Sequence, residues 1–185
     1  MLWLIAGLTL FLGVHVFSSL RSARGRLVAL LGEGPYKGVY ALVSLAGFGL
    51  IIAGMGKAPS IELWNPPAWG RHAAIGVMPF VFILLAAAFI PGNLKRFTAH
   101  PMLWAVTLWA LAHLSANGDL AGALLFGGFG LYALYAMWSQ TRRGVRPAQT
   151  RRAVAGDIGA VVAGLIAYAL LLKFHASLFG VAVGY

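Results

Sequence analysis

Long apolar runs separated by short polar segments are the main pattern of this chain. Six runs approach or reach the roughly 20 residues that a membrane-spanning helix needs. They cover roughly residues 2–20, 37–56, 72–91, 101–116, 119–139 and 153–174. Because the runs are continuous rather than alternating, they exclude a membrane β-barrel. The pattern predicts an all-α, polytopic membrane bundle of about six transmembrane helices, forming a single domain over residues 1–185.

The ends of two runs add detail to this prediction. The fourth is the shortest, because Pro101 and an Asn-Gly-Asp turn at 117–119 bound it. In the first, the arginines follow the apolar residues instead of preceding them, which is the reverse of a cleavable signal peptide. We therefore expect the first run to be a retained span.

Composition agrees with a membrane location. Hydrophobic residues make up 61% of the chain and charged residues 10%, against about 45–50% and 25% in soluble domains. No cysteine is present, which excludes disulfides, thiolate metal sites, iron–sulfur clusters and cysteine nucleophiles.

The charges predict the orientation. The net charge is +10, from 14 Lys and Arg against 4 Asp and Glu. Eleven of these cations follow the first, third and fifth runs, and three lie on the other side, at Lys57, Arg71 and Lys173. By the positive-inside rule, both termini then lie on the non-cytoplasmic side. We expect the cations to contact membrane lipids and not nucleic acid, since they do not alternate with aromatic residues on a polar surface.

Small residues spaced by four indicate where helices pack closely. Gly156, Ala160 and Gly164 form such a stripe in the last run, and Gly118 and Gly122 form another at the start of the fifth.

Trp64 and Trp69 lie beside Glu62 in the second loop. They are typical of an interfacial aromatic belt, and the alternative is an entrance for a lipid-soluble substrate.

Few residues are available for chemistry inside the membrane. The four acidic residues all fall in loops or at the ends of runs, so no buried carboxylate pair exists for a proton pump or an acid–base hydrolase. Neither a His-Glu-x-x-His zinc motif nor a glycine-rich phosphate loop occurs. Five histidines remain: His15 and His113 inside runs, and His72, His100 and His175 at their ends.

Two buried histidines on separate helices suit a haem iron with two imidazole ligands. The alternative is that His15 and His113 only hydrogen-bond to neighbouring helices. Trp109 and Asn117 lie on the helix face of His113. His100 points about 220° away from His113, unless the helix begins after it.

The depths of these residues constrain such a site. His15 lies about 9 Å before Arg21, and His113 about 18 Å beyond Pro101, at 1.5 Å per residue. The two histidines therefore differ by about 9 Å in depth if both helices begin at one level, whereas one iron favours ligands at similar depth. Arg21 is a candidate partner for a haem propionate.

Three segments carry a resemblance to a known family. They are HVFSSLR at 15–21, YKGVY with SL at 36–45, and RFTAHP at 96–101 followed by LW, WALAHL and ANGD up to 119. On these motifs the chain resembles the NnrU family of bacterial membrane proteins and, through it, the plant 15-cis-zeta-carotene isomerases. The likeness extends over nearly the whole sequence.

The resemblance implies a small helix bundle in the bacterial inner (plasma) membrane that binds haem b. It implies His15 and His113 as the two axial ligands, with His100 as a supporting residue. Ala110 stands where the plant enzymes have a cysteine, and Gly56-Lys57 stand where they have another histidine. These departures bear more on the carotenoid activity than on the haem.

The sequence leaves three functions open. One is a haem-dependent isomerase or redox protein that acts on a lipid-soluble polyene, and the second is a non-enzymatic haem sensor or accessory factor in nitric oxide metabolism and denitrification. The third is a membrane methyltransferase using S-adenosylmethionine, because a His-Pro pair followed by an aromatic residue also occurs there. Against the third, Ala105 replaces the expected glycine and the acidic C-terminal segment of those enzymes is missing. Substrate, oligomeric state and redox partner are not predicted.

Overall fold

The computed structural model describes residues 1–180 and 183, and the regular secondary structure of these residues is helical apart from one isolated β-bridge. The helices are α1 (Leu2–Ser19), α2 (Arg21–Leu31), α3 (Glu33–Gly56), α4 (Gly70–Phe89), the 3-10 helix η1 (Asn93–Arg96), α5 (Pro101–Ala116), α6 (Leu120–Arg142) and α7 (Val154–Phe179). Five of them, α1, α3, α4, α6 and α7, are long and apolar enough to cross a membrane, and α5 is a shorter apolar helix. The prediction of an all-α polytopic membrane bundle is confirmed.

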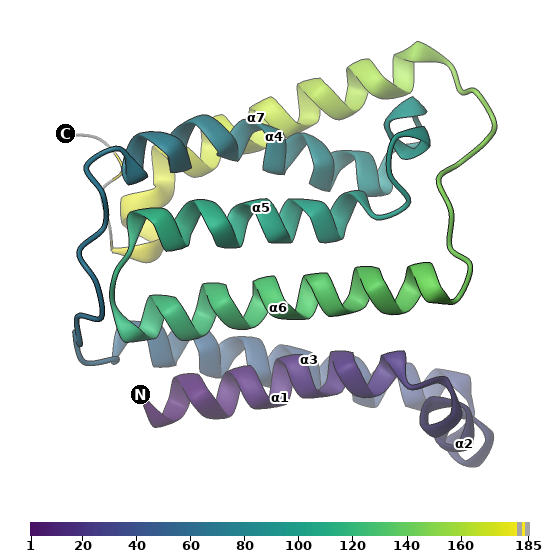
Figure 1. Ribbon diagram of the computed structural model, residues 1–185. Helices are drawn as coiled ribbons and strands as arrows, with labels where there is room; N and C mark the ends of the chain where they lie inside the picture. Colours follow the sequence, from purple (N-terminus) through teal and green to yellow (C-terminus); the bar gives the residue numbers. More distant parts are fainter. Residues whose placement is uncertain (181–182, 184–185) are drawn as a thin grey trace.

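The short amphipathic helix α2 is the main element that the hydropathy pattern missed. The hydropathy pattern predicts a loop for its 11 residues, because three arginines lower their hydropathy. None of its residues is buried, and it lies across the end of the bundle next to α3 (Figure 1). Such a helix fits the membrane interface, where it can keep its arginines in the polar layer. Helix α3 also begins earlier than predicted, at Glu33, and α7 continues beyond Lys173 to Phe179.

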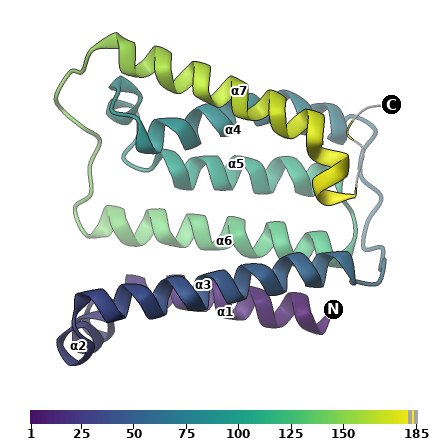
Figure 2. The same ribbon diagram turned by 180° about the vertical axis from the view of Figure 1, so that it is seen from behind.

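The six apolar helices run alternately up and down, and α6 lies between two groups (Figures 1 and 2). On one side α6 packs against α1, which pairs with α3. On the other side α6 packs against α5, which packs against α4, and α4 in turn against α7. Helices α1 and α7 therefore begin and end at the same end of the bundle, as an even number of spans requires. That this end faces the non-cytoplasmic side stays a prediction of the charge pattern.

The predicted small-residue stripe of α7 is confirmed as its packing surface on α4. Ala160 is fully buried at 1% exposure. A Cβ added at Gly164 would run into the backbone of Ile83, and one at Gly156 into the carbonyl of Pro91. By contrast, Gly118 lies in a turn against Trp64 and not on a helix face. The pair Gly118–Gly122 therefore marks a loop contact and the start of α6 instead of a helix–helix interface.

A second close contact, between α1 and α3, was not predicted. A Cβ at Gly7 would meet the backbone of Ile51, and a Cβ at Gly54 would meet the backbone of Leu4. Leu4 and Ile51 are buried in the same core cluster. Glycine here allows two helix backbones to approach, which is the usual basis of helix association in lipid.

The loop after α3 is anchored to the turn between α5 and α6. The amides of Leu63 and Trp64 both donate to the carbonyl of Gly118, at 2.8 and 3.1 Å. The side chains of Trp64 and Trp69 remain exposed, at 36% and 62%. Both tryptophans lie at the end of the bundle opposite α2, a position that fits the predicted interfacial belt and leaves the substrate entrance open as the alternative.

One carboxylate fastens the opposite loop. Asp157, in the first turn of α7, accepts hydrogen bonds from the backbone and side-chain nitrogens of Asn93, at 2.6 and 2.7 Å, and from the amide of Leu94 at 3.1 Å. The Asn93 side chain in turn bonds to both backbone groups of Arg152. Asp157 therefore holds α7 to η1, a role that its position in the sequence does not indicate.

We expect Gly54→Ala to lower the melting temperature in detergent by several degrees, because the added methyl would separate α1 from α3. Overpacking of this kind costs about 1–3 kcal/mol. Gly49→Ala in the same helix is the matched control, because a Cβ there meets open space, and it should leave stability unchanged or raise it. Equal melting temperatures for the two variants would contradict the close contact.

We expect Asp157→Ala to release α7 from η1, because three donors lose their acceptor at a cost of about 1–3 kcal/mol. Trypsin should then cleave faster after Arg151 and Arg152, which precede α7. Glu62→Ala removes an acid that makes no side-chain bond among the described residues, so cleavage of this control should match the unaltered protein. The same cleavage rate in both variants would show that Asp157 does not hold the loop.

Candidate functional site

His15 lies near the end of α1 that adjoins α2, and it is partly buried among aromatic rings. Its Nδ1 donates to the carbonyl of Phe11 at 2.6 Å, and its ring stacks on the ring of Phe11 with centroids 4.3 Å apart. Tyr40 of α3 and Tyr132 of α6 complete the surroundings, with ring centroids at 5.3 and 5.8 Å. His15 is thus contacted from three helices.

His113 lies in the last turn of α5 in a very similar local setting. Its Nδ1 donates to the carbonyl of Trp109 at 2.9 Å. Its ring stacks on Phe126 of α6 with centroids 4.7 Å apart, and the indole of Trp109 lies at 5.3 Å. The Asn117 side chain donates to the carbonyl of His113 at 2.8 Å and so closes the end of α5. Trp109 and Asn117 are therefore both neighbours of His113, as their shared helix face predicted.

The two hydrogen bonds fix which nitrogen of each imidazole donates. A backbone carbonyl can only accept, so Nδ1 carries a proton in both rings, and in the neutral form the lone pair is on Nε2. Among the residues that the structure describes, neither Nε2 has a hydrogen-bond partner. Metal-binding histidines typically show this pattern, with one ring nitrogen bonded to a carbonyl and the other left for the metal.

Helix α6 separates the two histidines and explains how both meet aromatic rings. Its aromatic residues recur every third position, at Phe126, Phe129, Tyr132 and Tyr135. Nine residues turn a helix by about 900°, which is half a turn beyond two full ones. The stripe therefore begins on the side of α5, where Phe126 meets His113, and ends on the side of α1. There the hydroxyl of Tyr135 lies 3.1 Å from that of Ser19.

The histidines lie at different levels along α6. Phe126, beside His113, and Tyr132, beside His15, are six residues apart, which is about 9 Å along the helix. Phe129 lies between these levels and contacts both Phe11 of α1 and Trp109 of α5, with ring centroids at 5.4 and 5.7 Å. The depth difference expected from the sequence is thus present in the fold, and aromatic rings fill the space between the levels.

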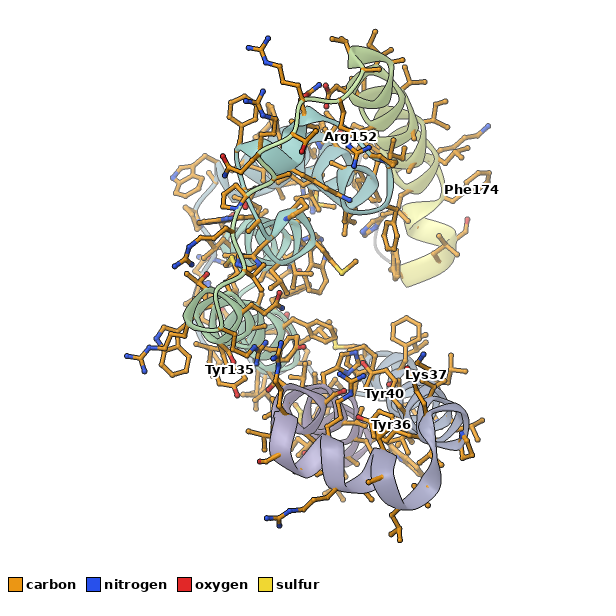
Figure 3. All side chains as sticks on the ribbon, turned by 90° about the vertical axis from the view of Figure 1, so that its right-hand side faces the viewer. Tyr36, Lys37, Tyr40, Tyr135, Arg152 and Phe174 are labelled. Atoms are coloured by element: carbon orange, nitrogen blue, oxygen red, sulfur yellow. The ribbon has the colours of Figure 1, made fainter. Side chains whose placement is uncertain are left out.

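Seen along their axes, the helices form a C (Figure 3). Helices α5 and α6 make its back, the end of α7 makes one arm, and α3, which carries Tyr36 and Tyr40, makes the other. Among the main packing contacts of the described residues, α3 reaches α6 only through α1, and α7 reaches α6 only through α4 and α5. The aromatic stripe of α6 therefore lies between two groups of helices that are not packed directly on each other.

The other predicted site residues lie apart from the two histidines. His100 precedes the first turn of α5, at the opposite end of that helix from His113, and its Nε2 lies 3.0 Å from the hydroxyl of Thr141. Arg21 opens α2, is exposed, and makes no hydrogen bond or ion pair with any residue that the structure describes. Over the described residues, no group of three or more His, Asp or Glu side chains is arranged to hold a metal.

Sequence reasoning missed the aromatic partners Tyr40, Phe129 and Tyr132. A signal for two of them was present, because aromatic residues at every third position of the fifth run define a stripe that winds around the helix. The third, Tyr40, lies on another helix, and only the packing of α3 on α1 brings it to His15.

Comparison with known proteins identifies the family. No curated protein and no solved structure matches the chain. The model of the NnrU protein family matches residues 3–183, which is nearly the whole sequence. The match includes both histidines, the aromatic stripe of α6 and the α7–η1 contact. This polytopic membrane protein therefore belongs to the NnrU family.

Proposed function

We propose that this NnrU family protein binds haem b inside the bacterial inner membrane, and that Nε2 of His15 and of His113 would hold its iron. The observation that carries the proposal is the hydrogen bond that each imidazole makes from Nδ1 to the carbonyl four residues before it. It leaves both Nε2 lone pairs available and sets both rings in the tautomer that a metal needs.

The surroundings of the two imidazoles support this assignment by their chemistry. Phe11, Phe129 and Trp109 form an apolar, aromatic lining between the two levels, which suits a flat macrocycle and excludes water. No carboxylate or thiol competes for iron, since the chain has no cysteine and its four acids lie at the ends of the bundle. When bound, haem would supply one-electron redox chemistry at a potential set by its ligands and by the polarity around it.

The difference in level places a requirement on the side chains. The ring of Phe129 lies between the levels of the two imidazoles, so one iron held by both requires this ring to turn away from Phe11 or Trp109. Phe129 is only partly buried, so its ring has room to turn. Turning this ring clears the space between the levels but does not bring the imidazoles to one level, so the proposal also requires them to move toward each other along α6. Arg21 remains available for an anionic group of the cofactor.

We further propose that the protein acts as an isomerase or redox protein on a lipid-soluble polyene. The aromatic stripe of α6 would bind an elongated apolar molecule entering from lipid between the α3 and α7 arms. The competing role is a sensor of nitric oxide, for which haem, when bound, would supply the gas-binding chemistry.

The absorption spectrum of the purified protein tests haem binding. We expect a six-coordinate, low-spin Soret band that His15→Ala and His113→Ala each convert to a five-coordinate spectrum or abolish. His100→Ala is the matched control, since His100 bonds to Thr141 at the far end of α5 from His113, and it should keep the low-spin spectrum. Unchanged haem content and spin state in both alanine variants would overturn the ligand assignment.

Incubation of the reduced protein with a cis-polyene tests the activity. We expect conversion to the trans isomer, and its loss in both histidine variants, with product measured by chromatography. Rapid mixing with nitric oxide is the counterpart experiment. Fast formation of a nitrosyl spectrum together with no polyene conversion would reject the isomerase and favour the sensor, while leaving haem binding intact.

A further inference from the structure

An open pocket of about 440 Å³ lies on the bundle surface where α5 begins and α6 ends. Its lining includes Trp104, Leu134, Trp138, His100, Thr141 and Arg142. The pocket is at the end of the bundle that carries α2 and most of the cations, and it does not include either of the two proposed haem ligands. It is therefore a site separate from the one described above.

The wall of the pocket is apolar and faces outward. Trp104, Leu134 and Trp138 are 44%, 49% and 55% exposed. In a membrane protein, side chains exposed on a spanning helix contact lipid, and tryptophans at a helix end lie at the level of the headgroups. The pocket thus has an acyl-chain side along α5 and α6 and a headgroup side at the helix ends.

The headgroup side is positively charged. The guanidinium of Arg142 lies over the ring of Trp138, 4.8 Å from its centroid, and it donates no hydrogen bond to any described residue. Its neighbours differ in this respect, because Arg143 donates to Ser19 and Ser139, and Arg146 donates to the carbonyl of Thr141. Arg142 is therefore held in place with its donors still available.

Two further features favour an anion here. The helix α5 begins at the pocket with His100 and Pro101, and a helix start carries a partial positive charge. No acidic side chain lines the pocket. Glu33 is paired with Lys37 at 2.8 Å, and Asp157 is occupied by Asn93, so neither neutralises Arg142.

We propose that this pocket binds an anionic phospholipid. Its phosphate lies at the guanidinium of Arg142 beside His100, and one acyl chain lies along Trp104 and Leu134. A free phosphate would leave the apolar wall uncovered, and an uncharged amphiphile would leave the donors of Arg142 unused. The bound lipid would connect the start of α5 to the end of α6, which the His100–Thr141 contact at 3.0 Å already joins.

Native mass spectrometry of the full chain in mild detergent tests the site, with phosphatidylglycerol and phosphatidylcholine of the same acyl chains as probes. We expect preferential retention of phosphatidylglycerol. Arg142→Gln should reduce that preference about fivefold, which is the effect of one cation near a lipid surface. Arg151→Gln is the matched control, since it removes the same charge from an exposed loop outside the pocket, and it should keep the preference.

Equal retention of the two lipids by the unaltered protein, the result for an uncharged amphiphile, would overturn the proposal. Equal losses in the two arginine variants would do the same, because they would show general surface attraction.

A second measurement does not depend on Arg142 variants. In vesicles containing both lipids, brominated phosphatidylglycerol should quench tryptophan fluorescence more than brominated phosphatidylcholine does at the same mole fraction. The variant carrying Trp104→Phe and Trp138→Phe should lose this difference. Persistence of the difference without these two tryptophans would place the lipid elsewhere and reject the pocket.

Discussion

The position of α6 between two groups of helices is the constraint on which the rest of the structure depends. Helix α1 packs on one of its sides and α5 on the other, and α3, α4 and α7 are attached through these two. In lipid there is no hydrophobic force between helices, so each contact depends on close backbone approach and shape. The glycines at α1–α3 and α4–α7 provide such approach within each group. Helix α6 presents aromatic rings to both groups instead.

The spiral of aromatic residues on α6 makes the two histidine environments alike. Phe126 faces α5 and Tyr132 faces α1, because a spacing of three residues advances around the helix instead of following one face. Each histidine then meets one ring of α6, and in each the aromatic residue four positions earlier also supplies the carbonyl for Nδ1. The same local arrangement therefore orients both imidazoles, although their helices, α1 and α5, make no main packing contact with each other.

Polar interactions are concentrated at the two ends of the bundle, where water and headgroups can solvate them. Asp157 joins α7 to η1 at the basic end. At the other end, the carbonyl of Gly118 accepts hydrogen bonds from the loop between α3 and α4. Arg142, held on the ring of Trp138, belongs to the same basic end. This separation follows from the high cost of unpaired polar groups in hydrocarbon, and it leaves aromatic rings and the two imidazoles between the ends.

The sequence by itself determined the fold class, the number of apolar helices, the accumulation of cations at one end and the two histidines inside the helices. Hydropathy and charge are local properties, so they can be read without knowing which helices are neighbours. It also predicted the α7 packing stripe, because glycine and alanine spaced by four define a face on any helix. The structure differs from the predictions at Gly118 and in α2. A loop contact decides the position of Gly118 and the membrane interface that of α2, and neither can be predicted from the face of a helix.

Only the tertiary structure decided that α6 lies between α1 and α5, that Tyr40 reaches His15, and that His100 bonds to Thr141 instead of joining His113. These facts depend on which helix surfaces fit together, and a periodic pattern does not specify its partner. The levels of His15 and His113 are an intermediate case. The sequence sets the position of each histidine along its own helix. Only the packing of His15 on Tyr132 and of His113 on Phe126, both in α6, decides how far apart the two histidines lie in depth.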